Sequence, residues 1–301
     1  MNSKYSFYQI HTKIDEMSKF LKLEKFVEGD KNTLDQIRSY YSVNDWAYRH
    51  FHSQDGFMHF RISLNGFFTD EDAYYQPDSV SELIKEGDVV MELGFGQGAN
   101  LLYLARCHPE VPFIGVDLGV LKKDAPSNVT TYQMDYSNLS KFEDNSVDVM
   151  YAFETIVHNT DKEKIYHEVY RVLKPGGVMV VFDYALTNRL ETYDPKIQKA
   201  IALISKGGAS AMIESLEELN AHYANCGLTV EKCIDHSRHW LPDLKRLERK
   251  AAKILERPVL SRFMFWLFPD QFVANIILGY LGYDTSNAGI LTYQQWVLRK
   301  P

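Results

Sequence analysis

The sequence predicts an α/β fold built on a doubly wound parallel sheet, and three observations lead to this prediction. Short apolar segments alternate with segments of helical periodicity from residue 88 to residue 182. A glycine-rich turn directly follows the first apolar segment, in the stretch VVMELGFGQGAN at residues 89–100. The next apolar segment ends in an acid, as FIGVD at residues 113–117. Strands that alternate with helices form a parallel sheet with both faces covered.

Seven segments are expected to be strands, which makes the sheet seven-stranded and Rossmann-like. They are residues 88–93, 111–117, 129–134, 147–153, 178–182, 229–234 and 293–299.

Helices are expected at 97–107, from about 160 to 173, and at 211–226. The second begins at Thr160, where Glu163 completes a capping box, and ends at the sequence KPGG at 174–177. Gly227 is the expected C-cap of the third helix.

The chain is expected to divide into an N-terminal helical, aromatic-rich cap, residues 1–76, and a core domain, residues 77–301. Residues 236–292 separate the last two strands and are expected to form a helical lid. The apolar stretch 263–272 in this insertion can touch a membrane as a peripheral contact or be buried against the core, and we expect burial.

Composition narrows the function classes. The net charge of −7 disfavours a nucleic-acid partner, because phosphate binding needs a basic surface. The three cysteines, Cys107, Cys226 and Cys233, are too scattered for a disulfide framework or a metal site, so we expect a cytoplasmic protein. Neither a signal peptide nor a membrane-spanning helix is expected. The oligomeric state stays open, with a homodimer as one alternative.

The glycine turn carries the first functional hypothesis. Glu92 precedes Gly94, Gly96 and Gly98, and glycines in such a turn let a ligand approach the backbone. An acid before the turn can accept hydrogen bonds from the ammonium of S-adenosylmethionine (SAM). The same glycines also fit the looser dinucleotide pattern of NAD enzymes, so the motif leaves both cofactors open.

Two further acids end strands on the same edge. Asp117 can bind the ribose hydroxyls of an adenosine, or else cap a helix. Asp135 can accept the adenine amino group while Tyr136 stacks on the base, or else Asp135 caps a turn.

The later motifs resemble a known family. The sequence YAFETIVH at 151–158, followed by IYHEVYRVLKPGG at 165–177, resembles the class I SAM-dependent methyltransferases. Within them the chain is most similar to the sterol C-24 methyltransferase and related isoprenoid and small-lipid group. The sequences GILTY at 289–293 and LRKP at 298–301 resemble the C-terminal strand of that group. The NAD alternative falls behind, because an NAD dehydrogenase is not expected to carry the VLKPGG segment.

The resemblance implies that SAM is the cofactor and that its methionine part lies on the glycine turn. The implied SAM contacts are Tyr41, Glu92, Gly94, Gly96, Gly98, Asn100, Asp117, Leu118, Asp135, Tyr136 and Phe153. The chain departs from the family pattern after Asp117, where residues 118–128 leave little room for the usual helix. The segment 46–61 matches no sterol-enzyme signature closely, so the acceptor need not be a sterol.

Methyl transfer to an alkene carbon leaves a carbocation, which aromatic faces stabilise and a base then deprotonates. Glu154 and His158 follow the fourth strand and are the expected proton acceptors, with His59 as a third candidate. Each histidine can instead be a structural residue. No metal site is expected, although His50, His52 and His59 are close in sequence. Arg49 and Arg61 could bind a diphosphate or be ordinary surface arginines.

The sequence thus predicts a SAM-dependent methyltransferase of an apolar small molecule, with carbon methylation of an isoprenoid-like or lipid acceptor as the preferred reaction. O- or N-methylation of a natural product and a non-catalytic SAM- or lipid-binding module are the alternatives.

Overall fold

The computed structural model describes residues 3–27 and 55–301. The expected SAM contact Tyr41, the histidines His50 and His52, and Arg49 lie outside the described residues.

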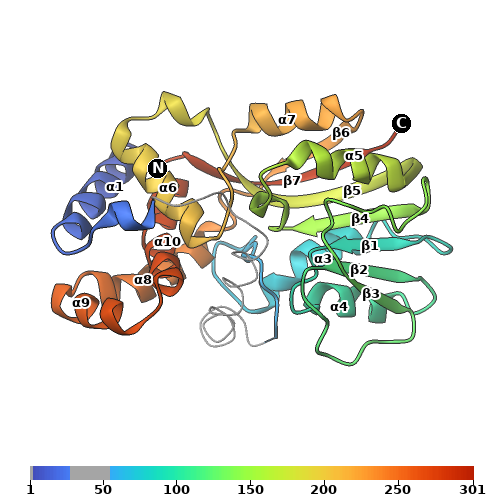
Figure 1. The fold of residues 1–301 in the computed structure, drawn as a ribbon, viewed down its shortest axis with the longest axis horizontal. Helices are drawn as coiled ribbons and strands as arrows, with labels where there is room; N and C mark the ends of the chain where they lie inside the picture. Colours follow the sequence, from blue (N-terminus) through green and yellow to red (C-terminus); the bar gives the residue numbers. More distant parts are fainter. Residues whose placement is uncertain (1–2, 28–54) are drawn as a thin grey trace.

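A seven-stranded sheet forms the centre of the protein, with the strand order β3-β2-β1-β4-β5-β7-β6 (Figure 1). Neighbouring strands from β3 to β5 run parallel, whereas β7 is antiparallel to both β5 and β6. The strands are β1 Val90–Leu93, β2 Phe113–Asp117, β3 Val129–Gln133, β4 Val147–Phe153, β5 Leu173–Leu186, β6 Thr229–Asp235 and β7 Leu291–Arg299. The predicted doubly wound, seven-stranded fold is therefore confirmed.

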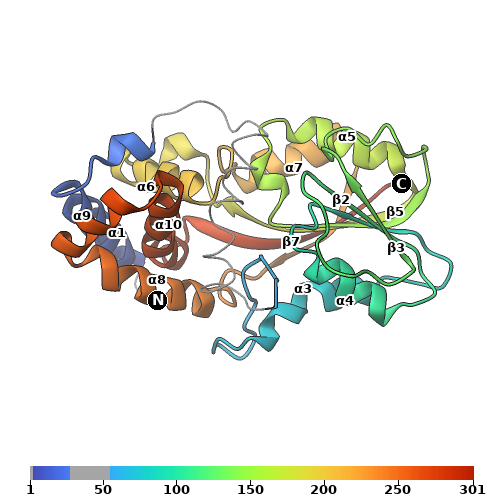
Figure 2. The ribbon, with the colours of Figure 1, turned by 60° about the horizontal axis from the view of Figure 1, so that its bottom comes forward.

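Helices cover both faces of the sheet. Two views agree that α3 Tyr75–Ser81 and α4 Ala99–Cys107 lie on one face, and α5 Lys162–Val172 and α7 Leu216–Asn225 on the other (Figures 1 and 2). Strand β4 shows why both faces are apolar, because Tyr151 and Phe153 belong to the core on one face and Met150 and Ala152 to the core on the other.

Capping residues explain two helix starts that the sequence analysis placed wrongly. Helix α7 begins at Leu216, not at 211, because Ser215 and Glu218 form a capping box. Helix α5 begins at Lys162, and its N-cap is Asp161, whose carboxylate accepts a hydrogen bond from Lys164 N, instead of Thr160. Strand β5 already begins at Leu173 and so includes the KPGG sequence.

Other expectations about local structure are confirmed. Gly227 follows α7 with a φ of 83°, in the left-handed conformation typical of helix ends. No helix forms between Asp117 and Asn128, as the short segment predicted.

A group of helices extends beyond one end of the sheet (Figure 1). It contains α1 Ser3–Ser18, α6 Pro195–Gly207, and three helices between β6 and β7, namely α8 Leu241–Leu255, α9 Pro258–Leu267 and α10 Asp270–Asn287. Short 3₁₀ turns connect the rest, at Leu23–Phe26, Glu71–Tyr74, Ile156–His158 and Leu190–Thr192. The segment 236–292 is therefore helical, as expected.

One buried ion cluster joins three of these helices. Lys13 of α1 lies 2.6 Å from Glu248 of α8 and 2.7 Å from Asp284 of α10. The ammonium also donates a hydrogen bond to the carbonyl of Tyr280. Removing one member would leave a buried charge without its partner, so the cluster fixes how the helices meet.

Helix α9 corrects the expectation that the stretch 263–272 is buried. Phe263 is 59% exposed and Trp266 is 80% exposed. Within the described residues, no helix has both the length and the apolar character needed to cross a membrane.

Candidate active site

The candidate residues gather at the carboxyl ends of β1, β2 and β4, which is the edge where open α/β sheets bind ligands. The segment 57–61, which precedes the sheet in sequence, lies against this edge through hydrogen bonds to Asn100 and Glu154.

The glycine turn needs glycine for two physical reasons. Gly94, Gly96 and Gly98 have φ values of 77°, 54° and 79°, in the left-handed region that side chains disfavour. In addition, a Cβ atom at Gly94 would lie 2.8 Å from the Cβ atom of Thr155. The turn is therefore held in close contact with the segment that follows β4.

Glu92 is a buried acid at the end of β1. It is 2% exposed, and Tyr151 donates a hydrogen bond of 3.1 Å to its carboxylate. Burial raises the pKa of Glu92 to about 8, and the nearby Asp117 raises it further. No ion pair to Glu92 occurs among the described residues. A ligand ammonium would fit this site, because it would stabilise the ionised carboxylate.

Asp117 shapes the glycine turn. Its carboxylate accepts hydrogen bonds from Gly96 N (2.8 Å) and from Gly119 N (2.6 Å). Leu118 lies between these contacts, and its carbonyl accepts a hydrogen bond from Gln133. Burial raises the pKa of Asp117.

The expected adenine residues make local contacts. Both oxygens of Asp135 accept hydrogen bonds from Ser137, one from its N–H and one from its hydroxyl. This is the turn-capping arrangement that the sequence left as an alternative. Tyr136 is 8% exposed and donates a hydrogen bond of 2.8 Å to the carbonyl of Thr155.

Glu154 lies directly after β4, and its carboxylate is buried among neighbouring side chains. One carboxylate oxygen accepts hydrogen bonds from Tyr293 Oη (2.6 Å) and from Phe60 N (2.7 Å). Burial raises the pKa of Glu154 to about 8, while the bond from Tyr293 opposes that rise. Its φ of 53° is unusual for a residue with a side chain, and such strain concentrates at functional sites.

His59 precedes Phe60, whose N–H donates to Glu154. It is 2% exposed, and its ring nitrogens lie 3.1 Å from the Phe60 carbonyl and 3.1 Å from Asn100 Oδ1. Burial lowers the pKa of His59 to about 4, so the ring is neutral at pH 7. Its edge-to-face contact with Phe153, at 5.6 Å between ring centroids, joins it to the aromatic cluster described below.

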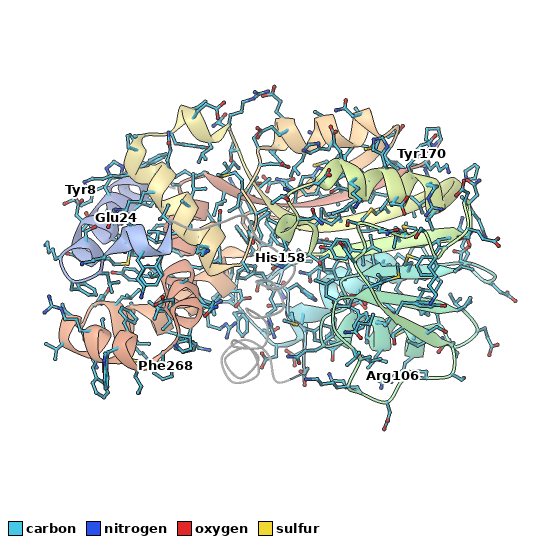
Figure 3. The ribbon with its side chains drawn as sticks, viewed as in Figure 1. Tyr8, Glu24, Arg106, His158, Tyr170 and Phe268 are labelled. Carbon is cyan, nitrogen blue, oxygen red and sulfur yellow. The ribbon has the colours of Figure 1, made fainter. Side chains whose placement is uncertain are left out.

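His158 is part of a different set of contacts. Its Nδ1 lies 3.1 Å from the carbonyl of Ala209, and burial lowers its pKa to about 4. Figure 3 shows it where the group of helices beyond the sheet meets the sheet. The preceding residue, Val157, donates its backbone N–H to Asp183 at 3.1 Å.

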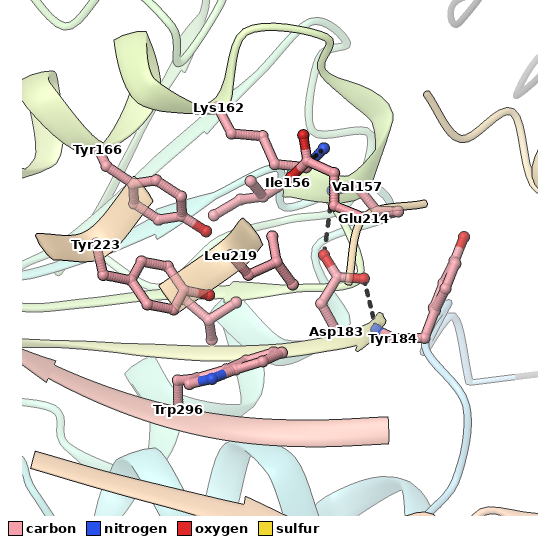
Figure 4. A pocket seen from close by; sticks show the side chains of 11 residues that line it. Ile156, Val157, Lys162, Tyr166, Asp183, Tyr184, Glu214, Leu219, Tyr223 and Trp296 are labelled. Atoms are coloured by element: carbon pink, nitrogen blue, oxygen red, sulfur yellow. Dashed lines mark hydrogen bonds and ion pairs between the residues drawn. The ribbon is translucent and has the colours of Figure 1, made fainter. Parts of the chain in front are cut away.

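Asp183 is a buried acid that sequence reasoning missed. It also accepts a hydrogen bond from Tyr184 N, and it borders a cavity of about 10 Å³, about the volume that one water molecule needs (Figure 4). Burial raises its pKa to about 7. Asp183 therefore fixes the turn that carries His158.

An aromatic cluster surrounds Glu154. Phe153 and Phe182 meet edge to face at 5.4 Å, and Trp240 stacks on Tyr293 at 4.9 Å between ring centroids. Phe60 contacts Trp240 at 5.4 Å. These side chains come from β4, β5, β7, the start of the 236–292 insertion and the segment before the sheet.

Two polar members of the site were not expected. Tyr293 was assigned only to a strand, and Gln76 to no role, yet the amide of Gln76 donates a hydrogen bond of 2.6 Å to the carbonyl of Phe60. The position of Tyr293 early in the last strand is the feature that could have indicated its role. Strand β7 pairs with β5, and the register sets Tyr293 opposite Tyr184, near the carboxyl end of β5. Among the described residues, no group of three or more His, Cys, Asp and Glu side chains could hold a metal ion.

Comparisons with known proteins identify the class. Residues 91–181 match the family model described as "Methyltransferase domain". The sterol 24-C-methyltransferase of Aspergillus fumigatus is 41% identical over 154 residues, which are 48% of this chain and 40% of that protein. Residues 91–181 thus match a methyltransferase domain, SAM is the cofactor of the relatives' class, and the chain aligns with about two fifths of the length of the sterol methyltransferases that it matches. The resemblance that the motifs indicated is confirmed.

A second relative and a solved structure extend the comparison. The 27-O-demethylrifamycin SV methyltransferase of Amycolatopsis mediterranei is 24% identical over 194 residues, 60% of this chain and 70% of that protein. The crystal structure of a mycolic acid cyclopropane synthase superimposes with a TM-score of 0.72 at 13% identity, over 91% of this chain and all of that one. This likeness shows the class I methyltransferase fold.

Proposed function

We propose that the protein transfers a methyl group from SAM to a carbon atom of an apolar, isoprenoid-like or lipid acceptor. The observation that carries the proposal is the pair of Glu154 and Tyr293, whose 2.6 Å hydrogen bond lies among buried aromatic side chains. The 41% sequence identity to a sterol 24-C-methyltransferase over 154 residues supports this acceptor class.

When bound, SAM supplies an electrophilic methyl group on a sulfonium, and S-adenosylhomocysteine leaves as a neutral thioether. On the acceptor, the electron pair of an alkene forms the new carbon–carbon bond, and the neighbouring carbon becomes cationic. The carboxylate of Glu154 then takes a proton from an adjacent carbon, whose bonding electrons restore an alkene. A base with a pKa of about 8 is suited to accept that proton near neutral pH.

The aromatic rings would stabilise the carbocation that forms on the acceptor. Faces of Phe, Tyr and Trp rings attract a positive charge, and burial strengthens that attraction. Phe153, Phe182 and Trp240 are 8%, 0% and 2% exposed. They exclude water, which would otherwise add to the cation in place of proton loss.

On the cofactor side, we propose that Glu92 binds the ammonium of SAM and that Asp117 binds the ribose. Gly94, Gly96 and Gly98 provide the close approach of the backbone, with Asn100 and Leu118 flanking them. Asp135 and Tyr136 are proposed for the adenine end, and Phe153 for the side that faces the acceptor. His59 and His158 are proposed as further proton acceptors, after Glu154.

Peripheral contact with membranes belongs to the same proposal, because apolar acceptors of this class reside in membranes. We also propose a location in the cytoplasm. The cytoplasmic location rests on the free cysteines, of which Cys107 and Cys233 are exposed.

O-methylation of a natural product is the second candidate, and the rifamycin-related methyltransferase is the observation that favours it. A non-catalytic SAM- or lipid-binding module is the third. Product analysis separates the three functions.

The test is an incubation of the purified protein with methyl-labelled SAM and a fractionated lipid extract, followed by mass spectrometry and NMR of the labelled product. We expect the label in an apolar fraction, on carbon. Label on oxygen or nitrogen would overturn carbon methylation. SAM binding without S-adenosylhomocysteine formation from any fraction would favour the binding module.

A further inference from the structure

Helix α9 exposes an apolar face at the far end of the group of helices beyond the sheet. Five large side chains form it, with exposed fractions from 37% to 85%: Val259, Leu260, Phe263, Trp266 and Leu267. At 100° per residue these five positions fall within an arc of about 120° on the helix surface. We call these five residues the α9 face.

The opposite side of α9 is fixed to the protein. Ser261 is fully buried, and its hydroxyl donates to the carbonyls of Ile254 (2.7 Å) and Arg257 (3.1 Å) at the turn from α8. Helix α9 is therefore held with its apolar residues facing outward. Figures 1 and 2 show α9 at the end of the molecule away from the sheet, and Figure 3 shows Phe268 near the same periphery.

The charges of α8 and α9 favour an anionic occupant. Residues 241–267 contain seven Lys and Arg against three Asp and Glu, an excess of four positive charges in a chain whose net charge is −7. Arg249, Lys253, Arg257 and Arg262 are exposed and form no ion pair with the part of the chain that the structure describes. Aromatic and aliphatic residues on one side with basic residues beside them are typical of helices that lie in a membrane interface.

We propose that the α9 face binds the surface of an anionic lipid bilayer. Phe263, Trp266 and their neighbours would enter the boundary between headgroups and acyl chains, while Arg257 and Arg262 would contact lipid phosphates. A partner protein with a surface of mixed charge would not account for the excess of positive charge in this part of an acidic chain.

Helix α8 connects this surface to the site. Trp240, at its N-terminal end, stacks on Tyr293, and its C-terminal end leads into α9. Fifteen helical residues span on the order of 20 Å, so the membrane would lie about that far from Glu154. The proposal deepens the peripheral membrane contact proposed above and is independent of the transfer reaction, since binding to lipid requires neither SAM nor acceptor.

The test is flotation of the full chain with vesicles of phosphatidylcholine, with and without phosphatidylglycerol. We expect the wild type to float with the anionic vesicles, and the double variant Phe263→Ser, Trp266→Ser to lose at least about tenfold in partitioning. Arg257→Gln and Arg262→Gln should each reduce binding to anionic vesicles about fivefold and leave neutral vesicles unaffected.

Two control variants keep the result interpretable. Phe67→Ser removes an aromatic side chain that is 78% exposed elsewhere, and it should bind like the wild type. Trp266→Phe keeps an aromatic ring on the α9 face, so it should still float but lose the contribution of Trp266 to the blue shift of tryptophan emission on binding. Trp240 and Trp296 are already buried and contribute little to that shift.

Three results would overturn the proposal. The first is that the wild type does not float with anionic vesicles, and the second is that the double serine variant floats as well as the wild type. The third is that neither protein binds vesicles while light scattering shows a dimer for the wild type and a monomer for the double variant, which would assign the face to a second copy of the chain. Since no methyl transfer is measured, each result leaves the proposed reaction standing or falling on its own test.

Discussion

At the scale of single residues, the hydrogen bond from Tyr293 to Glu154 sets the pH at which the proposed base works. Tyr293 stabilises the ionised carboxylate, so Tyr293→Phe should raise the pKa of Glu154 above about 8. Loss of a hydrogen bond to a charged group predicts that the rising limb of kcat/KM against pH moves up by about one to two pH units.

The matched control is Tyr223→Phe, because Tyr223 is equally buried but lies on α7, on the other face of the sheet. Its pH profile should match that of the wild type. An unchanged profile in Tyr293→Phe would show that Glu154 is not the titrating base.

Glu92 makes SAM binding depend on pH. Its pKa of about 8 in the free protein means that the carboxyl is largely protonated at pH 7, whereas a ligand ammonium favours the ionised form. Binding should therefore tighten as pH rises from 6 to 8 and should release protons at pH 7. Calorimetry in buffers of different ionisation enthalpy measures the release, which Glu92→Gln should abolish. Equal release from wild type and variant would contradict the assignment.

Residue roles were only partly predictable. Glu154 stood out because it follows a strand that ends at the ligand edge. Tyr293 did not, because its contact with Glu154 depends on strand β7 returning to the sheet after a long insertion. The contact of His158 with the carbonyl of Ala209 was not expected, because it depends on a segment 51 residues further along the chain.

At the scale of elements, the glycine turn and the segment after β4 form one unit. Gly94→Ala should weaken SAM binding at least about tenfold, because the added methyl group would displace Thr155, which also binds Tyr136. Gly176→Ala is the control, since its φ of 79° is nearly that of Gly94 but no atom lies within 4 Å of the added Cβ.

Both variants should lose about 1–2 kcal/mol of stability from the left-handed backbone alone. Thermal unfolding and SAM titration separate this shared cost from the steric one. Equal SAM affinity in the two variants would show that the contact between Gly94 and Thr155 does not position the cofactor.

Elements with strong periodicity were predicted well, as β1, β4 and α4 show. Helix α6 was not predicted, although Asp194 and Pro195 are a standard start signal. The start of α7 was misplaced, since the capping box at Ser215 outweighs the apolar residues before it.

At the scale of the whole molecule, three buried carboxyls make stability depend on pH. The pKa values of Glu92, Glu154 and Asp183, about 8, 8 and 7, lie above their ordinary values. Each contribution is complete below the ordinary carboxyl pKa and is lost as pH rises through the folded value. His59 and His158 oppose this trend below their ordinary pKa of 6.5, because burial keeps them neutral.

The ligand-free Tm should therefore fall between pH 7 and pH 8, where the carboxyls outweigh the histidines. Each fully titrating group contributes up to about 1.4 kcal/mol per pH unit. Glu92→Gln and Asp183→Asn should each flatten the decline. A Tm that stays level or rises across this window would contradict the burial of these acids in neutral form.

The overall architecture was predictable because alternating apolar segments and a seven-strand count define the sheet. The packing of α1 against α6 and α10 was not, because it depends on a buried ion cluster between residues 13, 248 and 284. Sequence separation of more than 200 residues hides such a cluster from local patterns.

The central claim is that Glu154 acts on the acceptor and not on the cofactor, and one variant tests it most directly. We expect Glu154→Gln to reduce turnover of the labelled lipid fraction about 10²–10⁴-fold, the usual effect of losing a general base. Its SAM affinity, measured by calorimetry, should stay within about twofold of wild type, since Glu154 bonds to Tyr293 and Phe60 rather than to the glycine turn. Equal loss of turnover and SAM affinity would contradict the account and make Glu154 a cofactor-binding residue.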